Sequence, residues 1–367
     1  MTAERELLRT TIADLLNEHC PTERVAAASG DNWDAARWQT LWRALEDTGL
    51  TLVGSPAEAG GSGGDLAAAA DIAMAAGAAA APVPLAETLA AAMVLARAGL
   101  DIPAGPLTLA VAADPDVPLR RVPYGRWATT VAVGADPADT DPDTGAPASG
   151  ALISGALLSS ARSGGEWLAV ASRPVRVQAG RNLAGEPRDE VELGAEAGFH
   201  VVPAGTADYA QGLLRLFRSL LIAGAAQRAL DLTVAYVNER EQFGRALARF
   251  PVVQQEIARM AGEVALITAA AQAAVAAGPG VGAGGAVAAV VAAKGQASQG
   301  AGTVAAIAHQ LHGAIGTTGE HRLRLTTTRL WSWRDEDGPA AECFAELGRS
   351  ALHAAHRGSG LWPWLTG

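Results

Sequence analysis

The sequence has few cysteines and few aromatic residues. Its 367 residues include two cysteines, Cys20 and Cys343, and only 5% are Phe, Trp or Tyr. Two cysteines so far apart give neither a disulfide framework nor a zinc spacing, and they fit a reducing cytoplasm. Nor do His309 and His312 have a further His, Asp or Glu at metal-ligand spacing, so we expect no metal site. Abundant alanine with few aromatics favours closely packed helices.

The chain also lacks an excess of positive charge and an unbroken apolar span. Its net charge of −10 argues against a nucleic-acid partner, because phosphate backbones need clustered Lys and Arg. The N-terminal segment MTAERELLRT carries charges where a signal peptide needs an apolar core. The most apolar stretch is interrupted by Asp71, Pro82, Pro84 and Glu87, short of the roughly 20 apolar residues of a membrane helix. We therefore expect a cytoplasmic protein without membrane contact.

What the sequence contains in quantity is apolar residues at helical spacing. With 49% hydrophobic residues, the chain can bury a large core and exceeds the usual size of one domain. Apolar residues recur every three to four positions in residues 1–102, with Asp34 and Asp65 as helix N-caps. Short β-like runs separated by Pro, Gly and Asp fill 103–205, and the helical period returns in 206–367. The sequence predicts a mostly α protein with an N-terminal helical domain, a small middle β domain and a C-terminal helical bundle.

An arginine motif lies at the end of the first long helix of the bundle. This helix is predicted from about Ala207 through Arg240, and the motif Arg-x-x-Phe-Gly ends at Gly244. A planar guanidinium at Arg240 suits two phosphate oxygens. The same residues also fit an ordinary helix end, since arginine complements the helix dipole and Gly244 accepts a left-handed conformation. The motif alone leaves both interpretations open. A second helix is predicted to begin at Pro251 and a third to span Ala286 to Leu311.

Two segments give the chain a resemblance to a known family. AQRALDLTVAYVNEREQFGRALARFPVVQQEIARM fits the pattern Y-x-x-x-R-x-x-F-G-x-x-L-x-x-F-x-x-x-Q, and AHQLHGAIGTTGEHRLRLTTTRLW fits a Q-x-x-G-G-x-G region. Over essentially its full length, the chain resembles the acyl-CoA dehydrogenase family of lipid metabolism. The resemblance implies a helical domain, a β-barrel or sandwich domain and a four-helix bundle. It also implies FAD-dependent α,β-dehydrogenation of an acyl-CoA thioester, with electrons passed to an electron-transfer flavoprotein. The implied assembly is a homodimer, a homotetramer, or a heterotetramer with a second family subunit.

The resemblance assigns FAD contacts to residues of both segments. In the family, the arginine at the place of Arg240 holds the FAD pyrophosphate of a neighbouring subunit. The aromatic residue at the place of Phe243 packs on the flavin portion, and Gly244 is expected to end the helix. Gln242, beside Phe243, is also expected to bind the cofactor. Gln310 and Gly313 match positions that present an amide and bare backbone to the diphosphate and adenosine of the opposite protomer.

The implied reaction needs a carboxylate that removes the α-proton in a dry pocket, where desolvation raises its pKa. The family keeps this base in one of two places. At the first, before Arg215, this sequence has Leu214. The second falls on WRDEDGP, where Asp337-Gly338 replaces the usual Glu-Gly by strict count and a shift of one residue selects Glu336. We expect Glu336 to be the base, with Asp337 next in line. Arg215 is expected near the base, which it can hold ionised, and near the substrate; otherwise it is a charge on the helix surface. A solvated acidic turn is the alternative interpretation.

The sequence departs from the family pattern in the β domain. The flavin-binding T-E-P-x-A-G-S-D loop and W-I-T-N strand find no match in the candidate segments VAADPDVPL and GALISGALLSSARS. On the adenosine side, Ala314 stands where a second glycine is usual, and Pro251 where glutamine is frequent. Three alternatives to an active dehydrogenase therefore stay open. They are a catalytically silent subunit paired with an active one, a flavin-dependent monooxygenase on the same fold, and a non-enzymatic interaction protein.

Overall fold

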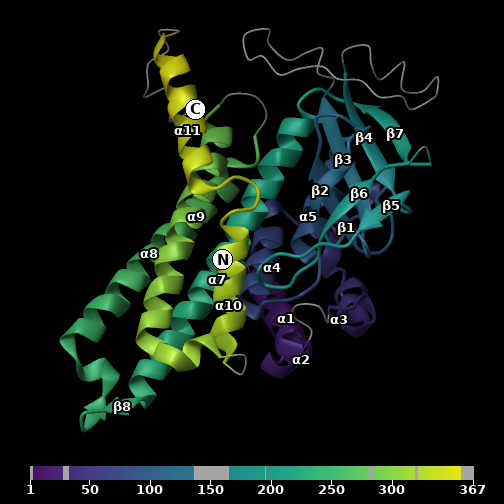
Figure 1. Cartoon of the computed structure of the whole chain (residues 1–367). Coiled ribbons are helices and arrows are strands. Elements are labelled where there is room, and N and C mark those ends of the chain that lie inside the picture. Colours follow the sequence, from purple (N-terminus) through teal and green to yellow (C-terminus); the bar gives the residue numbers. More distant parts are fainter. Residues whose placement is uncertain are drawn as a thin grey trace.

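The computed structural model contains a group of N-terminal helices, a small β domain and a long C-terminal bundle (Figure 1). The mostly α fold with a small β domain is thereby confirmed. The structure describes residues 3–27, 33–135, 165–194, 196–280, 284–318 and 321–356. The N-terminal helices are α1 (Ala3–His19), α2 (Thr22–Ala27), α3 (Ala35–Asp47), α4 (Leu66–Ala79) and α5 (Leu85–Arg97). The bundle contains α7 (Thr206–Glu239), α8 (Pro251–Ala277), α9 (Gly285–His312), α10 (Arg322–Trp333) and α11 (Ala340–His356).

Local sequence signals set the helix starts. The Asp34 carboxylate accepts a hydrogen bond from the Ala36 N–H at 3.1 Å, and Asp65 accepts one from the Ala68 N–H at 2.8 Å. Both predicted N-caps are confirmed. Pro251 is the first residue of α8, as predicted, because its missing N–H is not needed there.

The N-terminal helices are joined to the bundle by a close crossing of α4 and α7. A Cβ atom added to Gly224 of α7 would lie 1.9 Å from the Met74 carbonyl oxygen, and one added to Gly77 of α4 would lie 2.2 Å from the Leu221 carbonyl oxygen. The two backbones are therefore in direct contact, and only glycine fits at these positions.

The β domain consists of two small sheets. One has the strand order β1-β3-β4-β7, with β1 and β3 parallel and the other pairs antiparallel; the second has the order β2-β6-β5, all antiparallel. The predicted β-like runs form β1, β3, β4, β5 and β7, but β2 and β6 were missed because both are rich in charged residues. The strands are β1 (Leu107–Val111), β2 (Leu119–Pro123), β3 (Thr129–Ala135), β4 (Glu166–Ala171), β5 (Arg176–Gln178), β6 (Arg188–Glu192) and β7 (Gly198–Val202).

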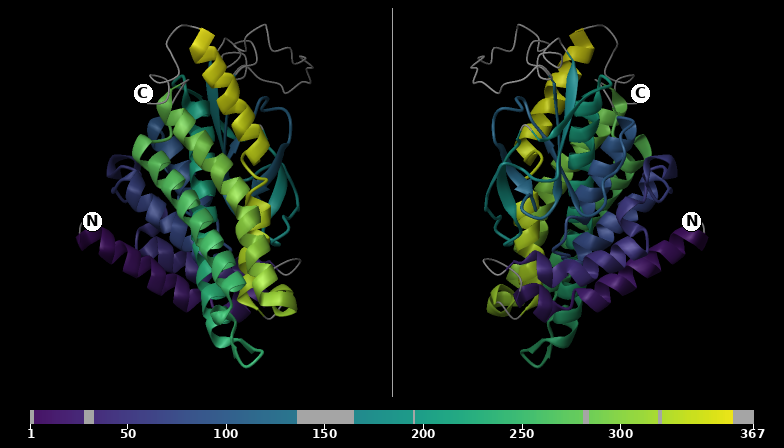
Figure 2. Two further views of the ribbon diagram at one scale, coloured as in Figure 1. Left: turned by 90° about the vertical axis from the view of Figure 1, so that its left-hand side faces the viewer. Right: turned by 90° about the vertical axis from the view of Figure 1, so that its right-hand side faces the viewer.

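The prediction that Gly244 ends the first long helix is wrong. Helix α7 ends at Glu239, and the C-cap Arg240 has an extended backbone. The chain then forms a hairpin of β8 (Glu241–Gln242) and β9 (Arg245–Ala246). Phe243 and Gly244 have φ values of 50° and 78°, which suits a two-residue hairpin turn. This hairpin projects from the end of the bundle in every view (Figures 1 and 2).

Helices α7 and α8 are long and apolar enough to cross a membrane by length and composition alone. More than half of the most apolar window of α7 is buried inside the protein, as in the core helix of a bundle. The corresponding window of α8 is mostly exposed, and α8 lies at the outer side of the bundle (Figure 1).

Gly224→Ala should destabilise the protein, because the added methyl would meet the backbone of α4 and not a movable side chain. We expect the free energy of unfolding to fall by about 1–3 kcal/mol, as for overpacked cores. Gly262→Ala in α8 is the matched control, since nothing lies within 4 Å of its added Cβ. Alanine there should raise stability by up to about 1 kcal/mol. Urea unfolding measures both; equal effects would contradict the close crossing.

Candidate active site

A cavity of about 350 Å³ lies between the β domain, the first half of α7 and the loop that joins α10 to α11. It brings together three of the predicted site residues, Arg215, Glu336 and Asp337. Its lining is strongly charged and includes Arg120, Arg121, Arg188, Arg215, Arg218, Asp335, Glu336, Asp337 and Glu342.

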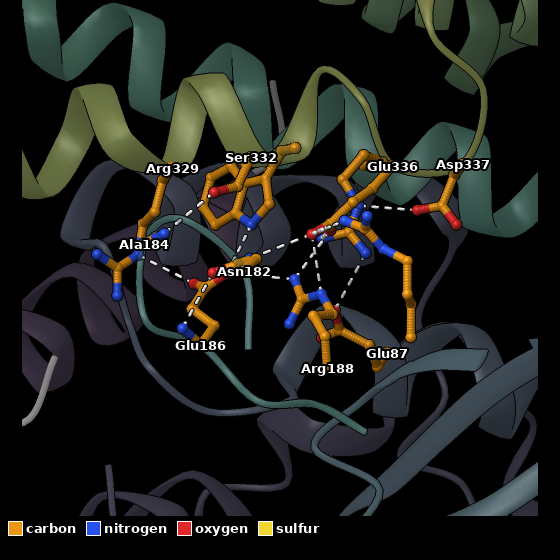
Figure 3. Close-up of polar contacts among 12 residues, drawn as sticks. Glu87, Asn182, Ala184, Glu186, Arg188, Arg329, Ser332, Glu336 and Asp337 are labelled. Carbon is orange, nitrogen blue, oxygen red and sulfur yellow. Dashed lines mark hydrogen bonds and ion pairs between the residues drawn. The ribbon is translucent and has the colours of Figure 1, made fainter. Parts of the chain in front are cut away.

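Glu336 is buried, with 7% of its surface exposed, and lies between two arginines (Figure 3). Arg188 Nε donates to Glu336 Oε1 and Arg188 Nη2 donates to Oε2, both at 2.9 Å. Arg218 Nη1 lies 3.2 Å from Oε2, and Asn182 Nδ2 donates to Oε1 at 3.1 Å. Both carboxylate oxygens therefore already have cationic partners.

These contacts reverse the expected effect of burial. Desolvation alone would raise the pKa of Glu336, but Arg188 and Arg218 outweigh it and lower the pKa to about 2. The expected raised pKa is therefore not found. A general base works best with a pKa near the operating pH, whereas in this arrangement both oxygens of Glu336 are engaged by arginines. The alternative of a solvated acidic turn does not describe it either, because the carboxylate is buried.

A second buried carboxylate extends the network on the far side of Arg188. Glu186 Oε2 accepts from Trp333 Nε1 at 2.9 Å and from Arg188 Nη2 at 3.2 Å, while Arg329 Nε lies 3.0 Å from Oε1. The neighbouring arginines lower the pKa of Glu186 although its burial opposes this. Glu186 therefore stays ionised and fixes Arg188 for Glu336 (Figure 3).

The N-terminal helices supply a third carboxylate to the same network. Glu87 of α5 lies 3.5 Å from Arg218 Nη2, and burial raises the pKa of Glu87. A void of only about 10 Å³ remains beside Glu87, Glu186, Arg188 and Arg218. It has room for about one water molecule. Side chains of this chain therefore fill the space between α4, α5, α7 and the β domain.

Arg215 does not hold Glu336, contrary to the expectation. Its Nη1 and Nη2 atoms donate to the two carboxylate oxygens of Glu346 at 2.9 and 2.8 Å. The arginine that faces the acidic loop is Arg218, whose Nε donates to Asp337 Oδ2 at 2.8 Å. Asp337 has a left-handed backbone with φ of 56°, which is uncommon for a residue other than glycine. The second candidate base is thus also engaged in an ion pair, although it borders the open cavity.

Lys294 is the only lysine in the chain. It lies in α9 and contacts the backbone of the acidic loop. It is fully buried in α9, and its ammonium donates to Ser298 Oγ at 2.5 Å, the Arg334 carbonyl at 3.1 Å and the Gly338 carbonyl at 2.7 Å. Burial lowers the pKa of Lys294 to about 8. Sequence reasoning missed this residue; a single lysine inside a long Ala-rich helix was the available signal.

The predicted FAD-contacting residues lie at the other end of α7. Tyr236, one turn before Arg240, stacks on His312 with ring centroids 4.4 Å apart, so the ends of α7 and α9 meet. Arg240 and Gln310 are both exposed. Within the part of the chain that the structure describes, neither side chain makes a hydrogen bond or ion pair. Gly313 has φ of 63° and ψ of −147°, a backbone conformation that favours glycine.

The hairpin carries the two remaining predicted cofactor residues. Gln242 is exposed, and Phe243 has 91% of its surface exposed. An exposed ring, a free guanidinium, a free amide and bare glycine backbone at one end of the bundle fit a phosphate-bearing aromatic molecule held by a neighbouring subunit. The fit to the diphosphate side of FAD is therefore good.

The flavin-ring side fits less well in this chain. The cavity between the β domain and α7 is lined by ion-paired side chains, and a neutral ring buried against them would remove water from these charges without offering them a new partner. The candidate segment VAADPDVPL contributes Val111 to the lining. The candidate segment GALISGALLSSARS lies outside the described residues.

Acid should weaken the fold through Glu336. Its lowered pKa means that its stabilising contribution is present above the unfolded pKa of about 4.5 and is lost as the pH falls toward about 2. Glu336→Gln should reduce this pH dependence and lower the free energy of unfolding at pH 7 by about 3–5 kcal/mol, because two buried arginines lose their partner. Asp335→Asn is the control on the same loop, with an exposed side chain and an expected change below about 0.5 kcal/mol. Urea unfolding between pH 7 and pH 3 measures both; a Glu336→Gln protein as stable as the parent would contradict the network.

Comparison with known proteins gives the family. The models of the acyl-CoA dehydrogenase N-terminal and C-terminal domains match residues 2–101 and 207–334. The acyl-CoA dehydrogenase IpdE2 of Mycobacterium tuberculosis is 32% identical over 334 residues, 88% of this chain and 89% of that protein. Two solved structures have the same fold. A variant of the steroid ACAD Tcur3481-Tcur3483 has a TM-score of 0.78 at 24% identity, covering 96% of this chain and 99% of that one. The ChsE4-ChsE5 complex of Mycobacterium tuberculosis has a TM-score of 0.76 at 20% identity, covering 96% and 98%. The chain therefore belongs to the acyl-CoA dehydrogenase family, FAD-dependent oxidoreductases that act on CH–CH groups.

Proposed function

We propose that this protein acts in the α,β-dehydrogenation of an acyl-CoA thioester as the non-catalytic subunit of a mixed assembly. In this proposal it contributes Arg240, Gln310 and Gly313 to the FAD of a partner subunit, and that partner carries the base. The observation that carries the proposal is the state of Glu336, whose two oxygens are occupied by Arg188 and Arg218 in a buried network.

The energy needed to free Glu336 argues against catalysis at this chain's own site. Turning Glu336 toward a substrate would leave Arg188 and Arg218 short of a counter-charge inside the protein. Breaking a buried pair in this way costs about 3–5 kcal/mol, and the freed carboxylate would still lie in the field of both arginines. The void of about 10 Å³ on one side of the network offers no room for an acyl chain, and the cavity of about 350 Å³ on which Glu336 borders is lined by charged side chains.

The chain's contribution to the reaction is then binding and orientation of the cofactor. Arg240, Gln310 and Gly313 would hold FAD, which would supply the acceptor for the hydride of the β-carbon; the partner's carboxylate would take the α-proton, and an electron-transfer flavoprotein would receive the electrons. The Arg240 guanidinium can donate two hydrogen bonds to diphosphate oxygens, and the Gln310 amide can donate another. Both side chains are exposed in the single chain, as residues that complete a neighbour's site have to be.

The names of two structural relatives support a mixed assembly. ChsE4-ChsE5 is described as a complex, and Tcur3481-Tcur3483 carries two protein names and is described as a steroid ACAD. We extend both features to this chain as part of the proposal. A steroid-derived acyl-CoA is therefore the first thioester to test, and the partner's pocket would set the acyl specificity.

An active dehydrogenase with Asp337 as its base is the second candidate. It is favoured by the position of Asp337 at the open cavity, with 20% of its side chain exposed, and by the glycine that follows it. Its ion pair with Arg218 counts against it, because Arg218 Nε already donates to Asp337 Oδ2 at 2.8 Å.

The two candidates differ in what the chain does alone. The tagged chain, purified from its native host, should carry a second subunit of the same family and bound FAD, and the complex should bleach anaerobically with acyl-CoA. The chain produced alone should not bleach. Asp337→Asn within the complex should leave turnover unchanged, whereas loss of a general base lowers it by about 10²–10⁴-fold. A lone chain that bleaches with acyl-CoA would overturn the non-catalytic assignment.

Arg240→Ala should lower the FAD content of the complex, because one diphosphate contact is lost. Arg249→Ala is the matched control, since Arg249 is an exposed arginine that follows the same hairpin. Absorbance at the flavin band relative to protein measures both variants. Full FAD content in Arg240→Ala would return Arg240 to the role of an ordinary helix end.

A further inference from the structure

We propose that Tyr236, His312 and His321 form a positioning cluster that sets the FAD-contacting ends of α7 and α9 relative to each other. The inference rests on the proposed function, in which Arg240 and Gln310 reach one diphosphate in a neighbouring subunit. These three rings act through Arg240 and Gln310, so they are positioning residues and not catalytic ones.

The first contact of the cluster joins α7 to α9. The Arg240 N–H donates to the Tyr236 carbonyl at 2.8 Å, which places the guanidinium one helical turn beyond the tyrosine ring. That ring stacks on His312 with an interplanar angle of 18°, and the tyrosine hydroxyl donates to the His312 carbonyl at 3.3 Å. His312 lies between Gln310 and Gly313 in the chain. A shift of the Tyr236 ring would therefore move Arg240 away from Gln310.

The second contact closes the cluster from α10. His321 is the N-cap of α10, and its Nδ1 accepts a hydrogen bond from the Leu323 N–H at 3.1 Å. Its ring centroid lies 5.0 Å from that of His312 and 6.4 Å from that of Tyr236, both edge-on. Three helices thus meet at one group of rings beside the predicted diphosphate contacts.

The geometry holds His312 as a neutral imidazole. His312 is buried, and its Nδ1 lies 2.8 Å from the Ala308 carbonyl, so this nitrogen carries the proton. Its Nε2 is buried without a hydrogen-bond partner among the described residues. The groups that face the ring are Tyr236 from α7, His321 from α10 and His309 from its own helix. None of these groups supplies a negative charge for a second proton.

Acid should therefore loosen the cluster. Burial lowers the pKa of His312 and of His321, so the unfolded chain takes up protons before the cluster does. The stabilising effect is fully present above the unfolded pKa of 6.5 and is lost as the pH falls below it. Because the rings position Arg240 and Gln310, FAD affinity should fall once the pH is far enough below 6.5 to protonate the folded cluster.

The test measures the dissociation constant of FAD in the purified complex by the fluorescence of released flavin. Tyr236→Leu removes the stack and should weaken FAD binding by about tenfold or more, whereas Tyr236→Phe keeps the stack and should stay within about threefold. Phe199→Leu is the matched control, since it removes a ring that contacts Trp167 at 6.0 Å in the β domain. It should lower the melting temperature without changing the FAD affinity.

A pH series separates positioning from general stability. Between pH 7.5 and 5.5 the parent complex should lose FAD affinity by about tenfold, and His312→Phe, which keeps a ring but takes up no proton, should lose less. His321→Asn provides a second route, because asparagine preserves an N-cap acceptor and removes one titrating ring.

The outcomes separate this inference from the proposed function. Equal losses of FAD affinity in Tyr236→Leu and Phe199→Leu, or an unchanged pH dependence in both histidine variants, would overturn the positioning role. Reduced FAD content in Arg240→Ala together with parental affinity in Tyr236→Leu would overturn the positioning role alone. Full FAD content in Arg240→Ala would overturn the proposed function itself.

Discussion

The bidentate ion pair between Glu336 and Arg188 is the contact on which the arrangement of the three parts of the molecule depends. Glu336 comes from the loop after α10, and Arg188 comes from β6 of the β domain. Arg218 of α7 joins them to Glu87 of the N-terminal helices. Charges taken out of water are tolerated only with good geometry and satisfied partners. The network therefore holds the N-terminal helices, the β domain and the bundle in one relative position. Removing any member would leave a buried charge short of a partner, which is energetically costly.

This constraint separates a structural carboxylate from a catalytic one. Strongly perturbed pKa values occur both at active sites and in structural ion-pair networks, and the paired geometry of Glu336 matches the second kind. A base that works near neutral pH needs a raised pKa. The two arginines instead lower the pKa of Glu336 to about 2. The family's chemistry needs a carboxylate that is shielded from water and has no ion-pair partner. Glu336 is shielded from water but is ion-paired with arginine.

Local rules predicted much of the fold and little of this network. The caps at Asp34 and Asp65 could be predicted because a cap depends on a few consecutive residues. Counting along a family motif also located the acidic loop that borders the cavity. The role of Arg188 could not be predicted from the sequence. Strand β6 has the sequence Arg-Asp-Glu-Val-Glu, which is typical of an exposed segment, and Glu336, the partner of Arg188, lies 148 positions away. Gly244 was misassigned for a different reason: a helix end and a hairpin turn both favour glycine with positive φ.

In the proposed function, helix α7 links the buried ion-pair network to the cofactor contacts. It carries Arg218 in the buried network and Arg240 at its C-cap, about 33 Å apart at a rise of about 1.5 Å per residue. At that separation, the ion pairs around Arg218 do not contact the groups around Arg240. Because the helix between them is continuous, the network anchors the end that presents the guanidinium. Under the proposed function, the ion pairs that occupy Glu336 at one end thus stabilise the scaffold that presents Arg240 at the other.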